Sequence, residues 1–129
     1  METVYIDVPN KKWGVVVVYG FDVDVDYVDL LAIMRSFGMA QRDAKRAIGV
    51  LANYNTGMAI SLGDLRMSAI FIAKATSFSE FWDTLNHELY HVNVAIIDYY
   101  GEPYDGEGAA YLQGHLMQQA VEKIGEPCY

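Results

Sequence analysis

The chain has 129 residues, of which 53% are hydrophobic and 13% aromatic, so it can form one ordinary domain with a packed core and is not globally disordered. Its formal net charge of −8 repels phosphate backbones, and we expect no nucleic-acid partner. The first residues lack the basic and apolar regions of a secretion signal, and every apolar run is shorter than the ~20 residues that cross a membrane. The lone cysteine, Cys128, excludes an internal disulfide, so together these features predict a cytoplasmic protein without a membrane partner.

The first half of the chain predicts a strand followed by two helices. Residues 13–19 include four consecutive valines, which are typical of a strand that is buried on both faces. Apolar residues then recur with a helical period over about residues 26–38 and again over about residues 41–53.

Three aspartates precede the first of these helices. Asp22, Asp24 and Asp26 mimic the start of a calcium-binding loop, but Tyr27 stands where that loop requires glycine. We therefore reject a calcium site and interpret the aspartates as a solvated acidic segment that also charges the start of a helix.

The middle of the chain predicts a β-hairpin. Asn55-Thr56-Gly57 is a turn signal, and two short apolar segments follow, residues 58–62 and 67–73, joined across Gly63-Asp64. We interpret segment 67–73 as an edge strand to which an extended peptide can add through backbone hydrogen bonds. The expected sheet then has about three strands.

The last third of the chain predicts two helices. Ser77 followed by Glu80 has the form of a capping box, and the apolar period that begins there continues to about Tyr100. The segment 101–103 contains glycine and proline and breaks the helix, after which residues 107–124 resume a helical pattern.

The first of these helices contains His87-Glu88-Leu89-Tyr90-His91, which matches H-E-x-x-H, the signature of zinc peptidases. Residues four apart share a helix face, so His87 and His91 can present both imidazoles to one ion. Glu88 projects beside them, where it can act as general base toward a water that the metal activates. The motif therefore predicts a zinc site with a catalytic glutamate.

A catalytic zinc ion usually has three protein ligands, so a third must come from outside the motif. We choose Glu107, because it opens the next helix and an antiparallel helix pair brings such a residue back toward the preceding helix. His115, two turns further along, is the rival ligand, and Asp98 and Asp105 are weaker alternatives.

Peptide hydrolysis also needs a group that stabilises the oxyanion of the transition state. His115 and Tyr111 are the candidates on the helix that Glu107 opens, and Tyr104 in the preceding loop is a looser one. We expect His115 and Tyr111 to join Glu88 as catalytic residues.

The stretch from Asn55 to Gln118 resembles the small H-E-x-x-H proteins encoded by bacteriophages and prophages of gut Bacteroidetes. The likeness rests on segments 55–57, 67–73, 76–81 and 84–88, and on Glu107 with residues 111–114. That family resembles minimal gluzincins, in which a glutamate on the helix after the active-site helix is the third zinc ligand. The resemblance implies a zincin-like fold, Glu107 as that ligand and a bacterial host cytoplasm, although Tyr111 stands where longer gluzincins have an acid.

We therefore expect a single α+β domain over residues 1–129, with a small antiparallel or mixed sheet, an H-E-x-x-H helix and a following C-terminal helix. The predicted function is that of a zinc-dependent metallopeptidase acting on a peptide or protein substrate. The alternative is a zincin-like metal-binding protein with little or no hydrolysis that serves as a protein-interaction module. A third interpretation rests on a resemblance to zinc peptidases that cleave phage repressors, whose target is a regulator.

Overall fold

The computed structural model describes residues 1–127 and 129, and Cys128 lies outside the described residues. The elements in chain order are β1 (Glu2–Val8), the 3₁₀ turn η1 (Pro9–Lys11), β2 (Trp13–Tyr19), α1 (Tyr27–Ser36), α2 (Gln41–Leu51), β3 (Gly57–Leu62), β4 (Met67–Ile72), α3 (Phe78–Tyr100) and α4 (Glu107–Ile124). The fold is α+β, as the sequence predicted, and its mixed four-stranded sheet has the order β1-β2-β4-β3.

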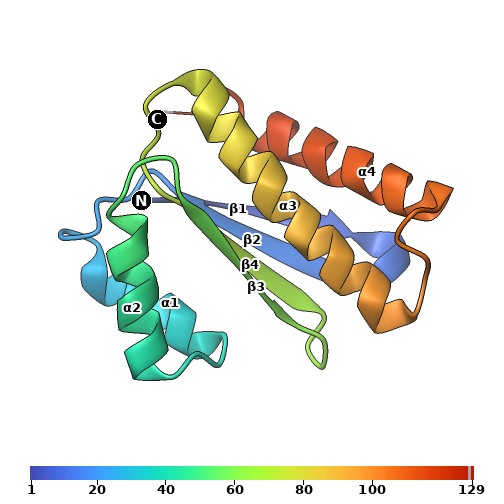
Figure 1. Cartoon of the computed structure of the whole chain (residues 1–129), viewed down its shortest axis with the longest axis horizontal. Coiled ribbons are helices and arrows are strands. Elements are labelled where there is room, and N and C mark those ends of the chain that lie inside the picture. The colour runs from blue at the N-terminus through green and yellow to red at the C-terminus, as the bar shows by residue number, and fades with distance from the viewer. Residues whose placement is uncertain (128) are drawn as a thin grey trace.

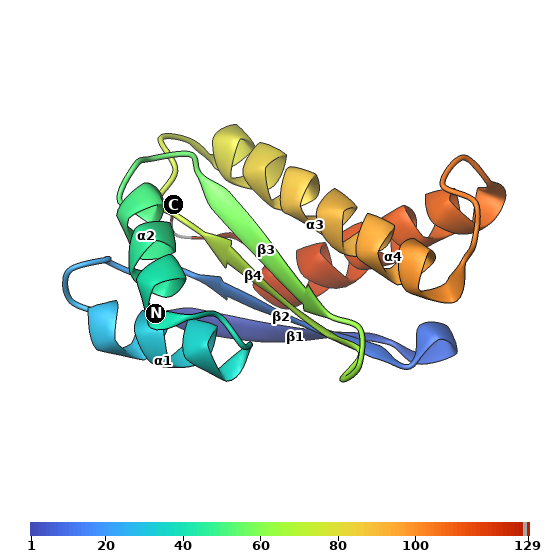
Figure 2. The same cartoon turned by 60° about the horizontal axis from the view of Figure 1, so that its bottom comes forward.

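Helices cover both faces of the sheet (Figures 1 and 2). One apolar core lies between the sheet and the pair α3 and α4, and the other lies between the sheet and the pair α1 and α2. Alternate valines of β2 enter the two cores: Val15 and Val17 enter the first, and Val18 enters the second. The run of valines is therefore explained by a strand that is covered on both faces.

The sheet has one strand more than the sequence predicted. β1 pairs antiparallel with β2 across η1, with Ile6 opposite Val15. Its signal in the sequence is the short alternation of Val4, Ile6 and Val8, of which the last two are fully buried under α4. This alternation is easily overlooked beside the longer apolar run of β2.

The prediction that segment 67–73 is an edge strand is wrong. β4 lies inside the sheet, where Ile70 is opposite Val17 of β2 in a parallel pair and opposite Ala59 of β3 in an antiparallel pair. The crossover through α1 and α2 allows the parallel pairing with β2 and so places β4 next to it. A strand paired on both sides cannot accept a peptide, so the outer strands of the described sheet are β1 and β3.

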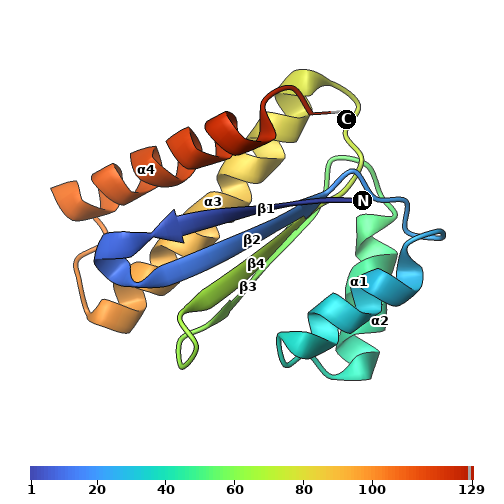
Figure 3. The ribbon, with the colours of Figure 1, turned by 180° about the vertical axis from the view of Figure 1, so that it is seen from behind.

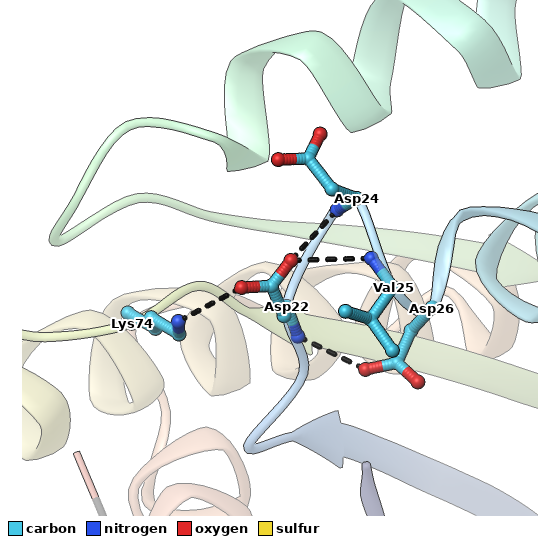
Figure 4. A network of polar contacts seen from close by, with 5 residues as sticks. All are labelled: Asp22, Asp24, Val25, Asp26 and Lys74. Carbon is cyan, nitrogen blue, oxygen red and sulfur yellow. Dashed lines mark hydrogen bonds and ion pairs between the residues drawn. The ribbon is translucent and has the colours of Figure 1, made fainter.

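The three aspartates form the turn that leads from β2 into α1 (Figure 4). The Asp22 carboxylate accepts hydrogen bonds from the N–H groups of Asp24 (2.9 Å) and Val25 (3.2 Å), and Lys74 Nζ lies 3.2 Å from it. These contacts, the Val25 N–H first among them, lower the pKa of Asp22 below its ordinary value. The Asp26 carboxylate accepts the Asp22 N–H at 2.9 Å, so the acidic side chains shape the entry to α1.

The long helix α3 has the limits that the sequence predicted. The Ser77 side chain accepts a hydrogen bond from the Glu80 N–H at 3.1 Å, and Gly101 ends the helix with a φ of 67°, a conformation that glycine adopts without strain. α3 packs over β3 and β4, whereas α4 packs beside α3 and over β1 (Figure 3). Within the described residues, no helix is long and apolar enough to cross a membrane.

Candidate metal centre

The H-E-x-x-H motif places three potential ligands in the middle of α3. The ligand atoms of His87, Glu88 and His91 all lie within 4.8 Å of one another. Among residues 1–127 and 129, no other set of three histidine, cysteine or acidic side chains gathers in this way. Both imidazoles are exposed to solvent, whereas the Glu88 side chain is only 5% exposed.

The two imidazoles already have the spacing of metal ligands. The Nε2 atoms of His87 and His91 are 3.2 Å apart, with ring planes inclined by 74°. Two nitrogens bound to one tetrahedral zinc ion at about 2.0–2.1 Å lie about 3.3 Å apart. The same distance suits an N–H···N hydrogen bond from one ring to the other. A metal ion can therefore take the place of the proton between the two nitrogens without a movement of α3.

Glu88 supplies an unsatisfied acceptor beside the imidazoles. Its Oε2 atom is buried and has no hydrogen-bond partner among the described residues. Burial raises the pKa of Glu88, and the nearby His91 and His87 partly oppose that rise. Buried polar atoms are normally hydrogen-bonded, so this oxygen is unusual, and the hollow that Glu88 lines beside His87 gives a ligand access to the carboxylate. Two imidazoles with a carboxylate beside them are a set of side chains that suits zinc.

The loop before β3 forms the wall of the site next to Glu88. A Cβ on Gly57 would lie 3.0 Å from Glu88 Cγ and 2.9 Å from Thr84 Cγ2, so only glycine allows β3 to approach α3 this closely. Asn55 adopts a φ of 62°, and its side-chain oxygen accepts the Thr76 N–H at 2.9 Å. The sequence indicated only a turn here, and its Asn-Thr-Gly pattern is the one signal that marks these positioning residues.

A closed network of amide groups joins α4 to a different face of α3. Asn93 Nδ2 donates to the Ala109 carbonyl and to Gln113 Oε1, both at 3.0 Å. Gln113 Nε2 in turn donates to Asn86 Oδ1 at 3.0 Å. At 100° per residue, Asn86 and Asn93 lie roughly a third of a turn around the helix from His87. α4 is therefore held beside the histidines rather than over them.

Glu107, the predicted third zinc ligand, is not brought to the cluster. It is exposed at the first position of α4, two residues before the Ala109 carbonyl that receives Asn93. This contact places the start of α4 past the C-terminal side of His91 and on another face of α3. Asp98 and Asp105 are also outside the cluster, and Asp98 accepts a hydrogen bond from Tyr104. The described residues thus supply two imidazoles and Glu88, but no third ligand from α4.

His115 and Tyr111, the predicted oxyanion stabilisers, lie at the opposite edge of the sheet. The half-buried His115 has its Nε2 atom 2.9 Å from the Asp7 carbonyl of β1, and Tyr111 is 75% exposed. Both line a hollow of about 570 Å³ beside η1. The motif instead lies by β3, which is three strand spacings, or roughly 14 Å, from β1 across the sheet. The structure does not bring these two side chains to Glu88, because α4 runs along β1.

Comparison with protein-family models, with curated proteins and with solved structures finds no match for the chain. The resemblance to phage-encoded H-E-x-x-H proteins therefore stays a prediction. The chain has an α+β fold in which His87, Glu88 and His91 form a group that can hold a metal ion.

Proposed function

We propose that the chain is a zinc-dependent metallopeptidase with a zincin-like site, in which His87 and His91 hold the ion and Glu88 is the general base. One observation carries the proposal: the ligand atoms of His87, Glu88 and His91 lie within 4.8 Å of one another, and the two Nε2 atoms are 3.2 Å apart. A buried carboxylate without a hydrogen bond destabilises a fold, so its presence favours a role in chemistry over a role in packing.

Zinc, when bound, lowers the pKa of a coordinated water to about 7 and polarises a peptide carbonyl. The Glu88 carboxylate, which lines the same hollow as His87, would accept a proton from water there. Burial raises the pKa of Glu88 above its ordinary value. The protonated carboxyl is therefore easier to form, and it can pass its proton on to the leaving amine. His87 and His91 would hold the ion, and Glu88 would move the proton.

The test is hydrolysis of a proteome-derived peptide mixture by the zinc-loaded protein, with new peptide ends counted by mass spectrometry. Glu88→Gln is expected to keep its zinc and to lose cleavage by at least about 100-fold, because the general base is gone. Glu122→Gln, which changes an exposed glutamate of α4, is the matched control and retains full cleavage. Equal cleavage by Glu88→Gln and the wild type would contradict the proposal.

A second candidate function is metal-dependent binding of a partner protein without hydrolysis. Two observations favour it: both imidazoles are exposed on a helix surface, and α4 brings no third ligand to them. A side chain of the partner can then complete the coordination. This function predicts that the wild type binds zinc but cleaves no peptide, and that Glu88→Gln leaves partner binding unchanged.

A further inference from the structure

Two adjoining hollows meet at the start of β3. The first, of about 380 Å³, has a polar lining that includes Thr84, His87 and Glu88 of α3. The second, of about 270 Å³, lies between α2 and β3. Val50 and Gly57 line both of them. The two hollows therefore form one groove, here named the α2–α3 groove, which passes from α2 across the start of β3 to the candidate zinc site.

The α2 half of the groove is apolar. Ala47, Val50, Leu51 and Met58 line it, and Val50 is 50% exposed although it is a valine. Asp43 and Arg46 lie at its rim with opposite charges, so this half carries no net charge. An apolar hollow of this volume is smaller than a typical drug-sized pocket and suits one large side chain.

The α3 half of the groove is acidic and leads to the reacting groups. Asp83 lines it with an exposed carboxylate that forms no ion pair among the described residues. With a net charge of −8 on the whole chain, this half attracts a basic occupant, tolerates a neutral one and repels an acidic one.

The base of the groove is the start of an outer strand. β3 pairs with β4 on one side only, so within the described sheet its other edge has no strand partner. An extended peptide is the occupant whose backbone matches such an edge and whose alternate side chains enter hollows along it.

We propose that the α2–α3 groove binds an extended peptide of neutral or basic character and selects a large apolar side chain in the hollow around Val50. The backbone next to that side chain lies over His87 and Glu88. Peptide selection follows from the groove alone, whereas the claim that the neighbouring bond is cleaved rests on the proposed function. Val50 is thus a specificity-determining residue, not a catalytic one.

The experiment uses zinc-loaded Glu88→Gln, immobilised to capture peptides from a proteome-derived library, with the captured sequences determined by mass spectrometry. We expect enrichment of Leu, Met, Phe or Val at one position of the captured peptides and depletion of acidic residues near it. Adding Val50→Lys lowers capture of these apolar peptides about tenfold, because the side chain they bury is excluded. Val50→Thr, which keeps the shape of valine, causes a smaller loss.

The matched control is Val121→Lys, the same substitution at a valine of α4 that is 51% exposed, and it leaves capture unchanged. Unaltered capture by Val50→Lys, or capture without apolar enrichment, overturns the proposal. Hydrolysis of the same library by the wild type separates the two claims. If capture depends on Val50 but no peptide is cleaved, the peptidase proposal is refuted and the groove proposal stands. If peptides are cleaved equally well with and without Val50, the groove proposal is refuted and the peptidase proposal stands.

Discussion

The helix α3 carries two polar clusters on different faces, and they differ in how well their hydrogen bonds are satisfied. On the face toward α4, Asn93 donates to the Ala109 carbonyl and to Gln113, and Gln113 donates to Asn86. On the face with the motif, the imidazoles are exposed and Glu88 Oε2 has no partner in the described chain. The first cluster attaches a helix, whereas the second keeps its imidazoles exposed beside the hollow that His87 and Glu88 line.

This difference shows how stability and function are separated within one helix. Removing a satisfied buried amide leaves its partners unpaired and destabilises the fold. Removing an unsatisfied buried carboxylate removes the free-energy cost of its burial. It takes away a group that serves a ligand rather than the fold. The changes to α3 proposed below each affect one of the two clusters, and a last change, in the turn before α1, gives the opposite pH dependence.

The largest expected effect is on zinc affinity. His91→Ala removes one of the two imidazoles and is expected to weaken zinc binding at least about 100-fold, measured by competition with a chromogenic chelator. His115→Ala removes the remaining histidine of the chain, which contacts the Asp7 carbonyl instead, and retains wild-type affinity. If His115→Ala weakened binding as much as His91→Ala, the metal could not be confined to the motif face.

The next effect is on stability and concerns the opposite face. Asn93→Ala leaves Gln113 Oε1 without its donor and removes the side-chain bond to the Ala109 carbonyl, and we expect it to lower the free energy of unfolding by about 2 kcal/mol in urea titrations. Its zinc affinity stays at the wild-type value. Gln118→Ala, at an exposed position of α4, is the control and changes stability little. A fall in zinc affinity on Asn93→Ala would show that the two clusters are coupled.

Glu88→Gln is expected to stabilise the metal-free protein by roughly 1 kcal/mol at pH 7, because it removes the charge of a buried side chain whose Oε2 atom has no hydrogen bond to the described residues. The raised pKa of Glu88 means that the folded chain holds this proton more tightly than the unfolded chain. The contribution of Glu88 to stability is therefore greatest below the ordinary glutamate pKa of about 4.3 and is lost as the pH rises through the raised value.

Urea titrations in excess chelator measure this difference at several pH values, with Glu122→Gln as control. The advantage of Glu88→Gln over the wild type should be present at pH 7 and vanish in acid. A wild type that is more stable than Glu88→Gln at pH 7 without metal would mean that the carboxylate has a stabilising partner.

Asp22 gives the smallest effect and the opposite pH dependence. Its lowered pKa means that its contribution to stability is present above the ordinary aspartate pKa of about 3.9 and is lost as the pH falls through the lowered value. Thermal melts between pH 7 and pH 3 should therefore show a steeper acid loss for the wild type than for Asp22→Asn. Parallel curves would mean that the bonds to Asp24 and Val25 do not depend on the charge.

Local signals predicted most of the elements and the core of the site. The valine run of β2, the Ser77 cap and the glycine after Tyr100 set limits that the structure confirms. The i, i+4 spacing of His87 and His91 also sufficed to place both imidazoles together, because a helix fixes that geometry without help from the rest of the fold.

The features that were not predicted depend on contacts between distant segments. The place of β4 inside the sheet follows from its parallel pairing with β2, which no local pattern encodes. The position of Glu107 depends on which face of α3 receives α4, and the contact from Asn93 to Ala109 decides that. Wall residues such as Gly57 become recognisable only when β3 and α3 are seen side by side.

The most direct test of the central claim is the metal content of the purified protein, measured by inductively coupled plasma mass spectrometry with His87→Ala beside it. We expect about one zinc ion per chain in the wild type and none in His87→Ala, since one helix face supplies both imidazoles. No zinc in the wild type after reconstitution, or equal zinc in both proteins, would contradict it.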